Sequence, residues 1–383
     1  MKMKYDLIVV GGGVLGAFHA FHAAQKGLKV LVVEKDKQPV SATVRNFGQV
    51  VPSGMDTKWQ NYGRESLQIY KEIQSVFDIS VRNNGSIYLA SNEEELTLLE
   101  ELNKINQSNS YESMLLTKQE CLSRYPGVKE SYVIGGLFFP EEVTVEPRTM
   151  IYRLHQYMQE ALEVEFSYLT PVINCEEDNN GVSVITASGV KIIATKVIIC
   201  CGSEFKTLFP IVFAQSDMEV TKLQMMQTVA QPNYELKGSI LTGWSIRRYE
   251  AFYECPSFAK IKTSEPIDSL QKKWGVHILF KQATDGSVII GDSHEYADVQ
   301  DIDKLGFDIK QEINDFMIQE AKKIVELPTY QIRDSWAGVY SQCKNTDIFN
   351  TTIGQNIHII TGIGGKGMTG SAGYSKQIIN SIF

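Results

Sequence analysis

Three glycines near the start of the chain, Gly11, Gly13 and Gly16, have the spacing of a loop that can hold a diphosphate. An apolar run precedes them and small residues follow, which predicts a strand, a tight turn and a helix. The first glycine permits the turn, the second lets a pyrophosphate approach the backbone, and the third lets helix and strand pack closely. Backbone N–H groups at the helix start, around Val14 and Leu15, would then face the phosphates.

Glu34 is the second candidate group for this site. It ends a short apolar run, residues 29–33, and Lys35 follows it. A carboxylate at the end of such a strand can accept hydrogen bonds from ribose hydroxyls. Glycine spacing alone also occurs in ordinary turns. A strand before it, a helix after it and the acid at Glu34 together predict a dinucleotide-binding site.

Three arginines, Arg247, Arg248 and Arg333, could bind an anionic ligand, because a guanidinium group matches carboxylate and phosphonate oxygens. Residues 239–253 have the alternating pattern of a strand, and neighbours on a strand point to opposite faces. Only one of Arg247 and Arg248 is therefore expected to point inward. Each arginine alone could instead be a solvated strand residue.

Two histidines and a lysine complete the candidate groups. His277 could hold positive charge or bind a ligand, or it could be a histidine satisfied within a sheet. His294 is expected to be structural, at a strand end where Asp292 and Ser293 cap a turn. Lys366 lies in a glycine-rich turn near the carboxyl end.

The composition excludes several classes of protein. The chain has 383 residues, of which 43% are hydrophobic and 21% charged, values typical of a soluble globular protein with more than one small core. Its net charge of −8 argues against a nucleic-acid or anionic-membrane partner. No apolar run approaches the roughly 20 residues that span a bilayer.

Neither a metal site nor a disulfide is expected. The six cysteines include no Cys-x-x-Cys pair and no histidines at zinc spacing, and adjacent Cys200 and Cys201 suggest buried thiols. The first strand begins almost at Met1, which leaves no room for a cleavable signal and predicts a cytoplasmic location.

Segments typical of a nucleotide-binding domain occur in three separated places. We expect an α/β, Rossmann-like domain built from residues 1–80, 145–220 and 330–383. Residues 81–144 and 221–329 have patterns typical of antiparallel strands and amphipathic helices, which predicts an α+β substrate domain. Both domains are discontinuous in sequence. Expected elements include strands at 85–90, 222–229, 239–253, 274–281 and 287–291, and helices at 92–104, 308–326 and 371–382.

The carboxyl end favours a flavin over a nicotinamide. An apolar run, 358–361, leads into a glycine-rich turn, 362–369, and then a helix, so the chain returns to the nucleotide domain at its end. Backbone N–H groups in such a turn can stabilise the negative charge that a flavin gains on reduction. The residues expected to take part are Gly364, Gly365, Lys366, Gly367, Met368 and Thr369.

These motifs occur in an order that resembles the D-amino-acid oxidase-like family of FAD-dependent oxidoreductases, which includes glycine and sarcosine oxidases. The resemblance covers essentially the whole chain, from the first glycine loop and Glu34 to residues 362–369. Arg45-Asn46-Phe47-Gly48-Gln49, Arg248-Tyr249 and Gly291-Asp292-Ser293-His294-Glu295-Tyr296 resemble a branch associated with aminophosphonate breakdown.

The resemblance implies FAD and further residues that contact it. The loop that runs past the flavin and pyrophosphate contributes Ser41, Thr43, Arg45, Asn46 and Gly48. Val172 would open the strand that meets the adenine, and Gly202 and Gly338 lie in two later family segments. His277 occupies the place where sarcosine oxidases carry a lysine over the flavin.

Two departures from the family pattern affect the expected chemistry. Sarcosine oxidases attach FAD through a cysteine two residues before a tyrosine. Here the tyrosine is Tyr340 and the residue two before it is Gly338, while Cys343 lies on the other side, so non-covalent FAD is expected. The family's lysine for the substrate carboxylate is also missing, because Thr369 falls near that position and Lys366 lies earlier.

The favoured hypothesis is FAD-dependent oxidation of a small primary or secondary amine bearing an anionic group, an amino acid or an aminophosphonate. The imine formed would hydrolyse, and electrons would pass to oxygen or another acceptor. His277, Arg248, Arg333 and Lys366 are the catalytic candidates. One alternative is a flavin monooxygenase, since Gly291-Asp292 resembles that class's phosphate motif. The other is a non-catalytic FAD-binding electron-transfer subunit, although the four-cysteine iron–sulfur spacing is missing.

Overall fold

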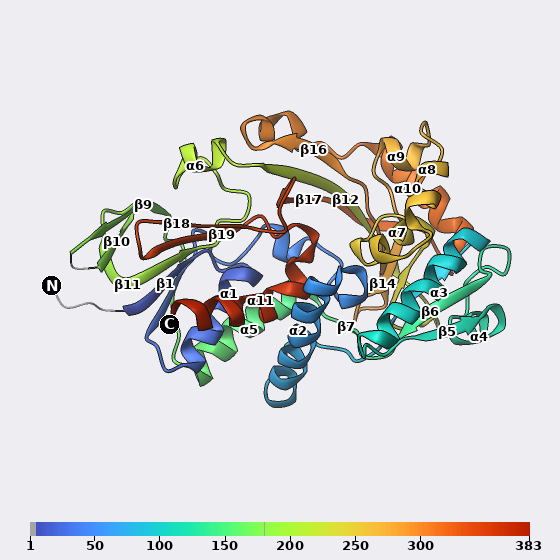
Figure 1. Cartoon of the computed structure of the whole chain (residues 1–383), viewed down its shortest axis with the longest axis horizontal. Coiled ribbons are helices and arrows are strands. Elements are labelled where there is room, and N and C mark those ends of the chain that lie inside the picture. Colours follow the sequence, from blue (N-terminus) through green and yellow to red (C-terminus); the bar gives the residue numbers. More distant parts are fainter. Residues whose placement is uncertain (1–4, 180) are drawn as a thin grey trace.

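Two β-sheets form the framework of the protein (Figure 1). The computed structural model describes residues 5–179 and 181–383. The first sheet carries the amino-terminal strand and the carboxyl-terminal helix, and the second lies beside it with its own helices. The expected mixed α/β architecture is confirmed, with segments from distant parts of the sequence in each sheet.

The first sheet has a parallel centre in the order β19-β11-β1-β2-β8. Strands β18, β10 and β9 extend it by antiparallel pairing. Its strands are β1 (Tyr5–Val10), β2 (Val30–Val33), β8 (Glu165–Ser167), β9 (Val172–Asp178), β10 (Gly181–Thr186), β11 (Lys191–Ile199), β18 (Phe349–Ile353) and β19 (Ile357–Thr361).

Four helices cover one face of this sheet, and a second apolar cluster that includes Leu31 and Val33 covers the other. The helices are α1 (Val14–Gln25), α2 (Thr57–Val76), α5 (Pro147–Ala161) and α11 (Gly367–Ile382). The first ten residues of α1 are all buried. The small residues among them, Gly16, Ala17, Ala20 and Ala23, let α1 pack closely against both β1 and α11. A strand covered on both faces needs apolar residues at successive positions, as in β2.

The second sheet is antiparallel except where β13 pairs with β4. Its strands are β4 (Ser86–Ala90), β5 (Met114–Thr117), β6 (Gly135–Phe139), β12 (Met218–Ala230), β13 (Ser239–Leu241), β14 (Leu279–Gln282), β15 (Ser287–Gly291), β16 (Glu295–Asp298) and β17 (Ile332–Cys343). Two short strands, β3 (Gln49–Val50) and β7 (Val143–Thr144), pair separately.

The remaining helices lie mostly around the second sheet (Figure 1). They are α3 (Glu93–Ser108), α4 (Lys118–Arg124), α6 (Pro210–Ala214), α7 (Gly243–Ile246), α8 (Phe258–Ser264), α9 (Leu270–Lys273) and α10 (Gln311–Ile324). Short 3₁₀ turns are η1 (Ala42–Val44), η2 (Pro52–Gly54), η3 (Glu250–Glu254), η4 (Val299–Leu305) and η5 (Gly364–Lys366).

Two sequence-based expectations about this sheet were wrong. The strand expected at 239–253 lasts only three residues, after which the chain forms α7 and η3. The Ser245 amide bonds the Thr242 carbonyl, and the Gly243 amide bonds Tyr132, so local turns and a distant side chain replace the strand ladder. Strand β17, expected in the nucleotide domain because it follows residue 330, pairs along β12 in the second sheet.

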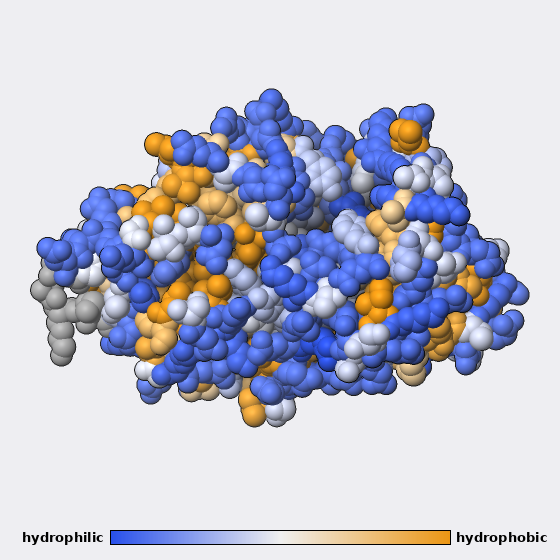
Figure 2. Space-filling view, viewed as in Figure 1, coloured by the Kyte–Doolittle hydropathy of each residue, from blue (hydrophilic) through white to orange (hydrophobic). Residues whose placement is uncertain are grey.

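No helix in the described ranges is long and apolar enough to cross a membrane. Figure 2 shows that the face in view is mostly hydrophilic, with hydrophobic residues in scattered groups.

Three buried histidines under the first sheet should make the fold sensitive to acid. Burial lowers the pKa of His19, His22 and His155 to about 4 each. Between that value and about 6.5 the unfolded chain binds protons that the folded chain does not, so the free energy of unfolding falls as the pH is lowered through this window.

Urea denaturation near pH 7.5 and pH 5 tests this prediction. Replacing one histidine, as in His19→Asn, should make the loss between these pH values smaller by about 2 kcal/mol, whatever the variant's absolute stability. An unchanged difference between the two pH values would contradict it.

Candidate functional site

A cavity of about 910 Å³ lies between the two sheets and is lined by residues of both. On one side it meets the carboxyl ends of the parallel strands β1, β2, β11 and β19, where ligands of such sheets bind. On the other side it is lined by residues of β12, β14 and β17 and by the segment around η3. It therefore has a nucleotide end and a second end over the antiparallel sheet.

The glycine loop leaves no room for side chains. Gly11 has a φ of +105°, and a Cβ added there would lie 2.3 Å from the carbonyl oxygen of Cys200. A Cβ on Gly16 would lie 2.0 Å from the carbonyl oxygen of Gly11. The Val14 N–H donates to Thr43 Oγ1 at 3.0 Å. In the described structure the N–H groups of Leu15 and Gly16 keep no protein acceptor, so the start of α1 can bind an anion.

Glu34 is held beside this loop with both carboxylate oxygens engaged. One oxygen accepts the Gly12 N–H at 2.8 Å and the other accepts the Asp36 N–H at 3.0 Å. Each oxygen keeps a lone pair that a ribose hydroxyl could use. Val172 opens β9 and lines the cavity nearby, as expected for a contact with an adenine ring.

The loop at residues 41–48 approaches the cavity through its backbone more than through its polar side chains. The Arg45 guanidinium donates to the carbonyl oxygens of Val40 at 2.8 Å and Ala337 at 3.0 Å. Asn46 donates to Ala42 and Thr43 carbonyls, and its oxygen accepts the Gly48 N–H. Both side chains thus shape the loop rather than reach freely into the cavity.

Gly48 does not line the cavity. Its φ is +73°, and a Cβ there would lie 2.2 Å from the Val145 carbonyl oxygen, so this glycine serves the turn. All the other residues expected to bind the cofactor line the cavity: Gly11, Gly13, Val14, Leu15, Gly16, Glu34, Lys35, Ser41, Thr43, Arg45, Asn46, Val172, Gly202, Gly338, Gly364, Gly365, Lys366, Gly367, Met368 and Thr369.

The glycine-rich turn before α11 closes the nucleotide end. Lys366 forms an ion pair with Glu250 at 2.7 Å, and its Nζ lies 5.7 Å from the centre of the Trp59 ring. Thr369 Oγ1 accepts the Val51 N–H at 3.1 Å. The cramped glycine loop, the free amides of α1, the acid at Glu34 and this second turn fit an extended flavin dinucleotide.

His155 is a residue of this end that the sequence did not reveal. From α5 its Nε2 donates to the Gly12 carbonyl at 2.8 Å, and its Nδ1 lies 3.1 Å from the Tyr168 hydroxyl. His155 therefore binds the carbonyl group of Gly12, while Glu34 binds the N–H group of the same residue. No local pattern indicates this contact, because the two residues are 143 positions apart.

At the second end of the cavity, His277, Asp292 and His294 lie together and are buried. Backbone hydrogen bonds join His277 and Asp292 in both directions, so they extend the pairing of β14 with β15. His277 Nε2 lies 2.9 Å from Asp292 Oδ1, and His294 Nε2 lies 3.9 Å from Oδ2. The sequence indicated a structural role at a turn for Asp292 and His294, and the structure places both side chains in the cavity wall.

Each imidazole ring of this cluster also has a hydrogen-bonding partner outside the cluster. His277 Nδ1 is 2.9 Å from Ser245 Oγ, and His294 Nδ1 is 2.9 Å from the Gly275 carbonyl oxygen. Burial lowers the pKa of His294. Burial acts to raise the pKa of Asp292, but its two histidines and Arg248 outweigh it and lower that pKa. Two imidazole nitrogens and a carboxylate oxygen within 4.8 Å could also hold a divalent cation.

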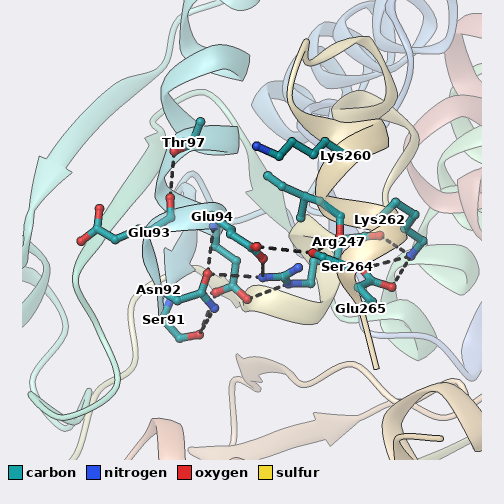
Figure 3. Close-up of polar contacts among 12 residues, drawn as sticks. Ser91, Asn92, Glu93, Glu94, Thr97, Arg247, Lys260, Lys262, Ser264 and Glu265 are labelled. Atoms are coloured by element: carbon teal, nitrogen blue, oxygen red, sulfur yellow. Dashed lines mark hydrogen bonds and ion pairs between the residues drawn. The ribbon is translucent and has the colours of Figure 1, made fainter. Parts of the chain in front are cut away.

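The three candidate arginines have different positions. Arg248 lines the cavity and donates to the Tyr296 hydroxyl at 2.8 Å and the Gly275 carbonyl at 3.2 Å. Arg247 points to α3, where it pairs with Glu94 at 2.8 Å and Glu95 at 3.0 Å (Figure 3). The two diverge because they follow the end of α7, not because they alternate along a strand.

Arg333 does not line the cavity. Its side chain is 42% exposed and pairs with Asp285 and Asp334, each at 2.8 Å. The catalytic candidates that the fold brings to the cavity are therefore His277, Arg248 and Lys366.

Glu34→Ala should weaken FAD binding. The change removes the carboxylate lone pairs that the ribose hydroxyls would use, and a hydrogen bond to a charged group is worth roughly 1.5–3 kcal/mol, so the affinity should fall at least about tenfold. Flavin titration of the apoprotein, followed by fluorescence, measures the change. Glu160→Ala, on the exposed face of α5, is the control, and equal affinities for both variants would contradict the role of Glu34.

Comparison with known proteins agrees with this geometry. Curated relatives include an opine oxidase subunit of Rhizobium meliloti, 25% identical over 59% of this chain, and glycine oxidase of Bacillus subtilis (strain 168), 24% identical over 53%. The chain spans 63% and 55% of their respective lengths.

Solved structures show the same fold over the whole chain. Glycine oxidase from Bacillus cereus ATCC 14579 aligns with a TM-score of 0.78 and 20% identity, covering 99% of this chain and 95% of its own. L-proline dehydrogenase from P. horikoshii aligns with a TM-score of 0.80 and 18% identity, covering 100% and 94%. The family model described as "DAO: FAD dependent oxidoreductase" matches residues 6–380. The chain therefore belongs to the DAO family of FAD-dependent oxidoreductases.

Proposed function

We propose that this protein oxidises a small primary or secondary amine that carries an anionic group, and that the imine formed is hydrolysed. The observation that carries the proposal is that one positive and one negative side chain both line the second end of the cavity. Arg248 offers a guanidinium there, and Asp292 offers a buried carboxylate. A small zwitterion presents the complementary anion and ammonium.

The bound flavin would supply the redox chemistry by accepting a hydride equivalent, two electrons and one proton, from the carbon–hydrogen bond beside the amine nitrogen. The protein's contribution is to hold the amine and exclude water. Tyr249 and Tyr340 line the same end, and burial raises the pKa of each, so both stay neutral hydrogen-bonding groups. Positioning of this kind accounts for much of the rate of such reactions. Electrons would pass on to oxygen or another acceptor.

The anionic group is best matched by a carboxylate, which makes the substrate an amino acid. Among the described residues at this end, Arg248 is the one cation with a free charge: it forms no ion pair with an acid, and it does not hold the loop at 41–48. Lys366 is paired with Glu250, and Arg45 donates to backbone carbonyls. A monoanion needs one such cation, whereas a phosphonate dianion favours several.

An aminophosphonate is the second candidate substrate. Three segments that resemble the aminophosphonate-associated branch, 45–49, 248–249 and 291–296, all contribute residues to the one cavity. Their meeting in space supports a shared role in substrate choice. The neutral hydroxyl groups of Tyr249 and Tyr340 could add donors for further phosphonate oxygens.

The two alternatives from the sequence receive different support. In a monooxygenase Asp292 would bind phosphate just before the closing helix, but here it ends β15 in the second sheet, with η5 and α11 far along the chain. One observation supports an electron-transfer subunit: a relative of this chain is named as a subunit of an opine oxidase. Reduction of the purified chain's flavin by an amine would exclude that alternative.

Arg248→Met tests the substrate class. Wild-type flavin should lose its visible absorbance anaerobically on addition of glycine, sarcosine or 2-aminoethylphosphonate. In the variant, the concentration needed for half-maximal reduction should rise at least about tenfold, because a charge-assisted hydrogen bond is worth roughly 1.5–3 kcal/mol. Arg333→Met, outside the cavity, is the matched control and should behave as wild type. Failure of every amine to reduce the flavin would refute the proposal.

The FAD should be non-covalent. Gly338, two residues before Tyr340, has no side chain that could form a bond. Cys343 lies beyond Tyr340, and burial raises the pKa of its thiol, which disfavours the reactive thiolate. Acid precipitation of the purified protein should leave the yellow flavin in the supernatant. Colour that pellets with the protein, and is lost in Cys343→Ser, would contradict this.

A further inference from the structure

We infer that His294 is the catalytic base that removes a proton from the substrate's ammonium group. The inference rests on the proposed amine oxidation. A small amine has a pKa near that of lysine, about 10, and so arrives protonated at neutral pH. Its nitrogen must have a free lone pair before electrons can leave the neighbouring carbon–hydrogen bond. A group in the cavity that takes this proton would make the bound ammonium form reactive at neutral pH.

The tautomer of His294 is fixed by a single contact. Its Nδ1 lies 2.9 Å from the Gly275 carbonyl oxygen, which can only accept a hydrogen bond. Nδ1 must therefore carry a hydrogen. In the neutral ring, which burial favours, Nε2 then carries a lone pair and no hydrogen.

That lone pair lies where a substrate can reach it. His294 lines the cavity, its ring stacks between those of His277 and Tyr296, and no hydrogen bond to Nε2 is formed within the described residues. Asp292 Oδ2 is 3.9 Å away, too far for a direct hydrogen bond. Once Nε2 is protonated, this carboxylate would stabilise the imidazolium.

His277 cannot play the same part. Its Nδ1 faces Ser245 Oγ at 2.9 Å and its Nε2 faces Asp292 Oδ1 at 2.9 Å, so both ring nitrogens have protein partners. It serves instead as a positioning residue that holds Asp292 beside His294.

The other charged or titratable groups around His294 are poorer bases. Arg248 is a cation that disfavours a second positive charge, which keeps the resting ring neutral. Asp292 Oδ1 already faces His277 Nε2 at 2.9 Å, and burial raises the pKa of Tyr249 and Tyr340, so these two phenols keep their protons. Tyr296 accepts a hydrogen bond from Arg248.

At the edge of this group, Glu250 is paired with Lys366. Among the described residues at this end of the cavity, His294 is thus the neutral side chain whose ring nitrogen, Nε2, has a free lone pair for a proton.

The step is balanced as a simple proton transfer. The nitrogen–hydrogen bond of the ammonium breaks, and its electron pair stays on the amine nitrogen. A new nitrogen–hydrogen bond forms at His294 Nε2. The imidazolium returns the proton to water after the product leaves.

His294→Asn removes the base but can keep the hydrogen bond to Gly275, because the asparagine amide can donate to that carbonyl. At about pH 7 the variant should reduce its flavin with the amine that works best in the wild type at least about 100-fold more slowly. The rate should recover as the pH approaches about 10, where the amine deprotonates in solution. His358→Asn, on β19 and away from the cavity lining, is the matched control. A pH profile of the same shape for wild type and His294→Asn would overturn the inference.

A second measurement does not depend on activity. The chain has six histidines, so ¹⁵N-labelled imidazole signals can be assigned with the two variants. His294 should show the tautomer with hydrogen on Nδ1. It should become doubly protonated on saturation with 2-amino-2-methylpropionate, or with (2-amino-2-methylpropyl)phosphonate if phosphonates reduce the flavin. Neither probe has an oxidisable hydrogen beside its nitrogen.

Hydrogen on Nε2 in the free protein would overturn the inference. So would one tightly bound divalent metal ion per chain, lost together in His294→Asn and Asp292→Asn, because that ion would occupy the lone pair. If no amine reduces the wild-type flavin, the proposed function fails, and the tautomer measurement still decides the state of His294.

Discussion

The close approach of backbone to backbone at the first glycine loop is the constraint on which the rest of the site depends. Gly11 touches the end of β11, and Gly16 touches Gly11, at distances that no Cβ permits. This contact places the start of α1 at the edge of the sheet with its amides pointing outward. Glu34 and His155 then hold the amide and carbonyl sides of Gly12, so the loop is rigid before any ligand binds.

The second end of the cavity depends on a buried charge cluster. Asp292 would be costly in an apolar interior, and its histidines and Arg248 offset that cost. The same arrangement gives the cavity an anionic and a cationic feature at one end. These residues therefore stabilise a buried charge and also determine the charge distribution at this end of the cavity.

Contacts between the two sheets keep the two ends in register. Lys281, on β14, is fully buried and bonds the Val145 carbonyl and Glu146, each at 2.8 Å. Burial lowers its pKa to about 8, but Glu146 supports its charge. Because Lys281 follows His277 by four residues, this bond fixes the histidine relative to α5 and the first sheet. Lys366 and Glu250 make a second link across the cavity.

The sequence alone determined the nucleotide end, because there the chemistry is local. Glycine spacing, an apolar strand on either side and an acid at Glu34 are set by backbone geometry within a few residues, and the structure places nearly all of them in the cavity. Element types at 85–90 and 287–291 also followed from the residue pattern and the neighbouring turn residues. The final glycine turn was recognisable for the same reason.

Only the tertiary structure decided the second end of the cavity, since its residues come from separate strands whose pairing no local pattern encodes. Arg248 and Arg333 look alike in sequence, yet one lines the cavity and the other pairs with acids at the surface. His294 resembles a turn residue until β14 and β15 pair and bring it beside His277. The direction of a side chain depends on long-range packing. The sequence could therefore identify the charged candidates, but it could not predict which of them point into the cavity.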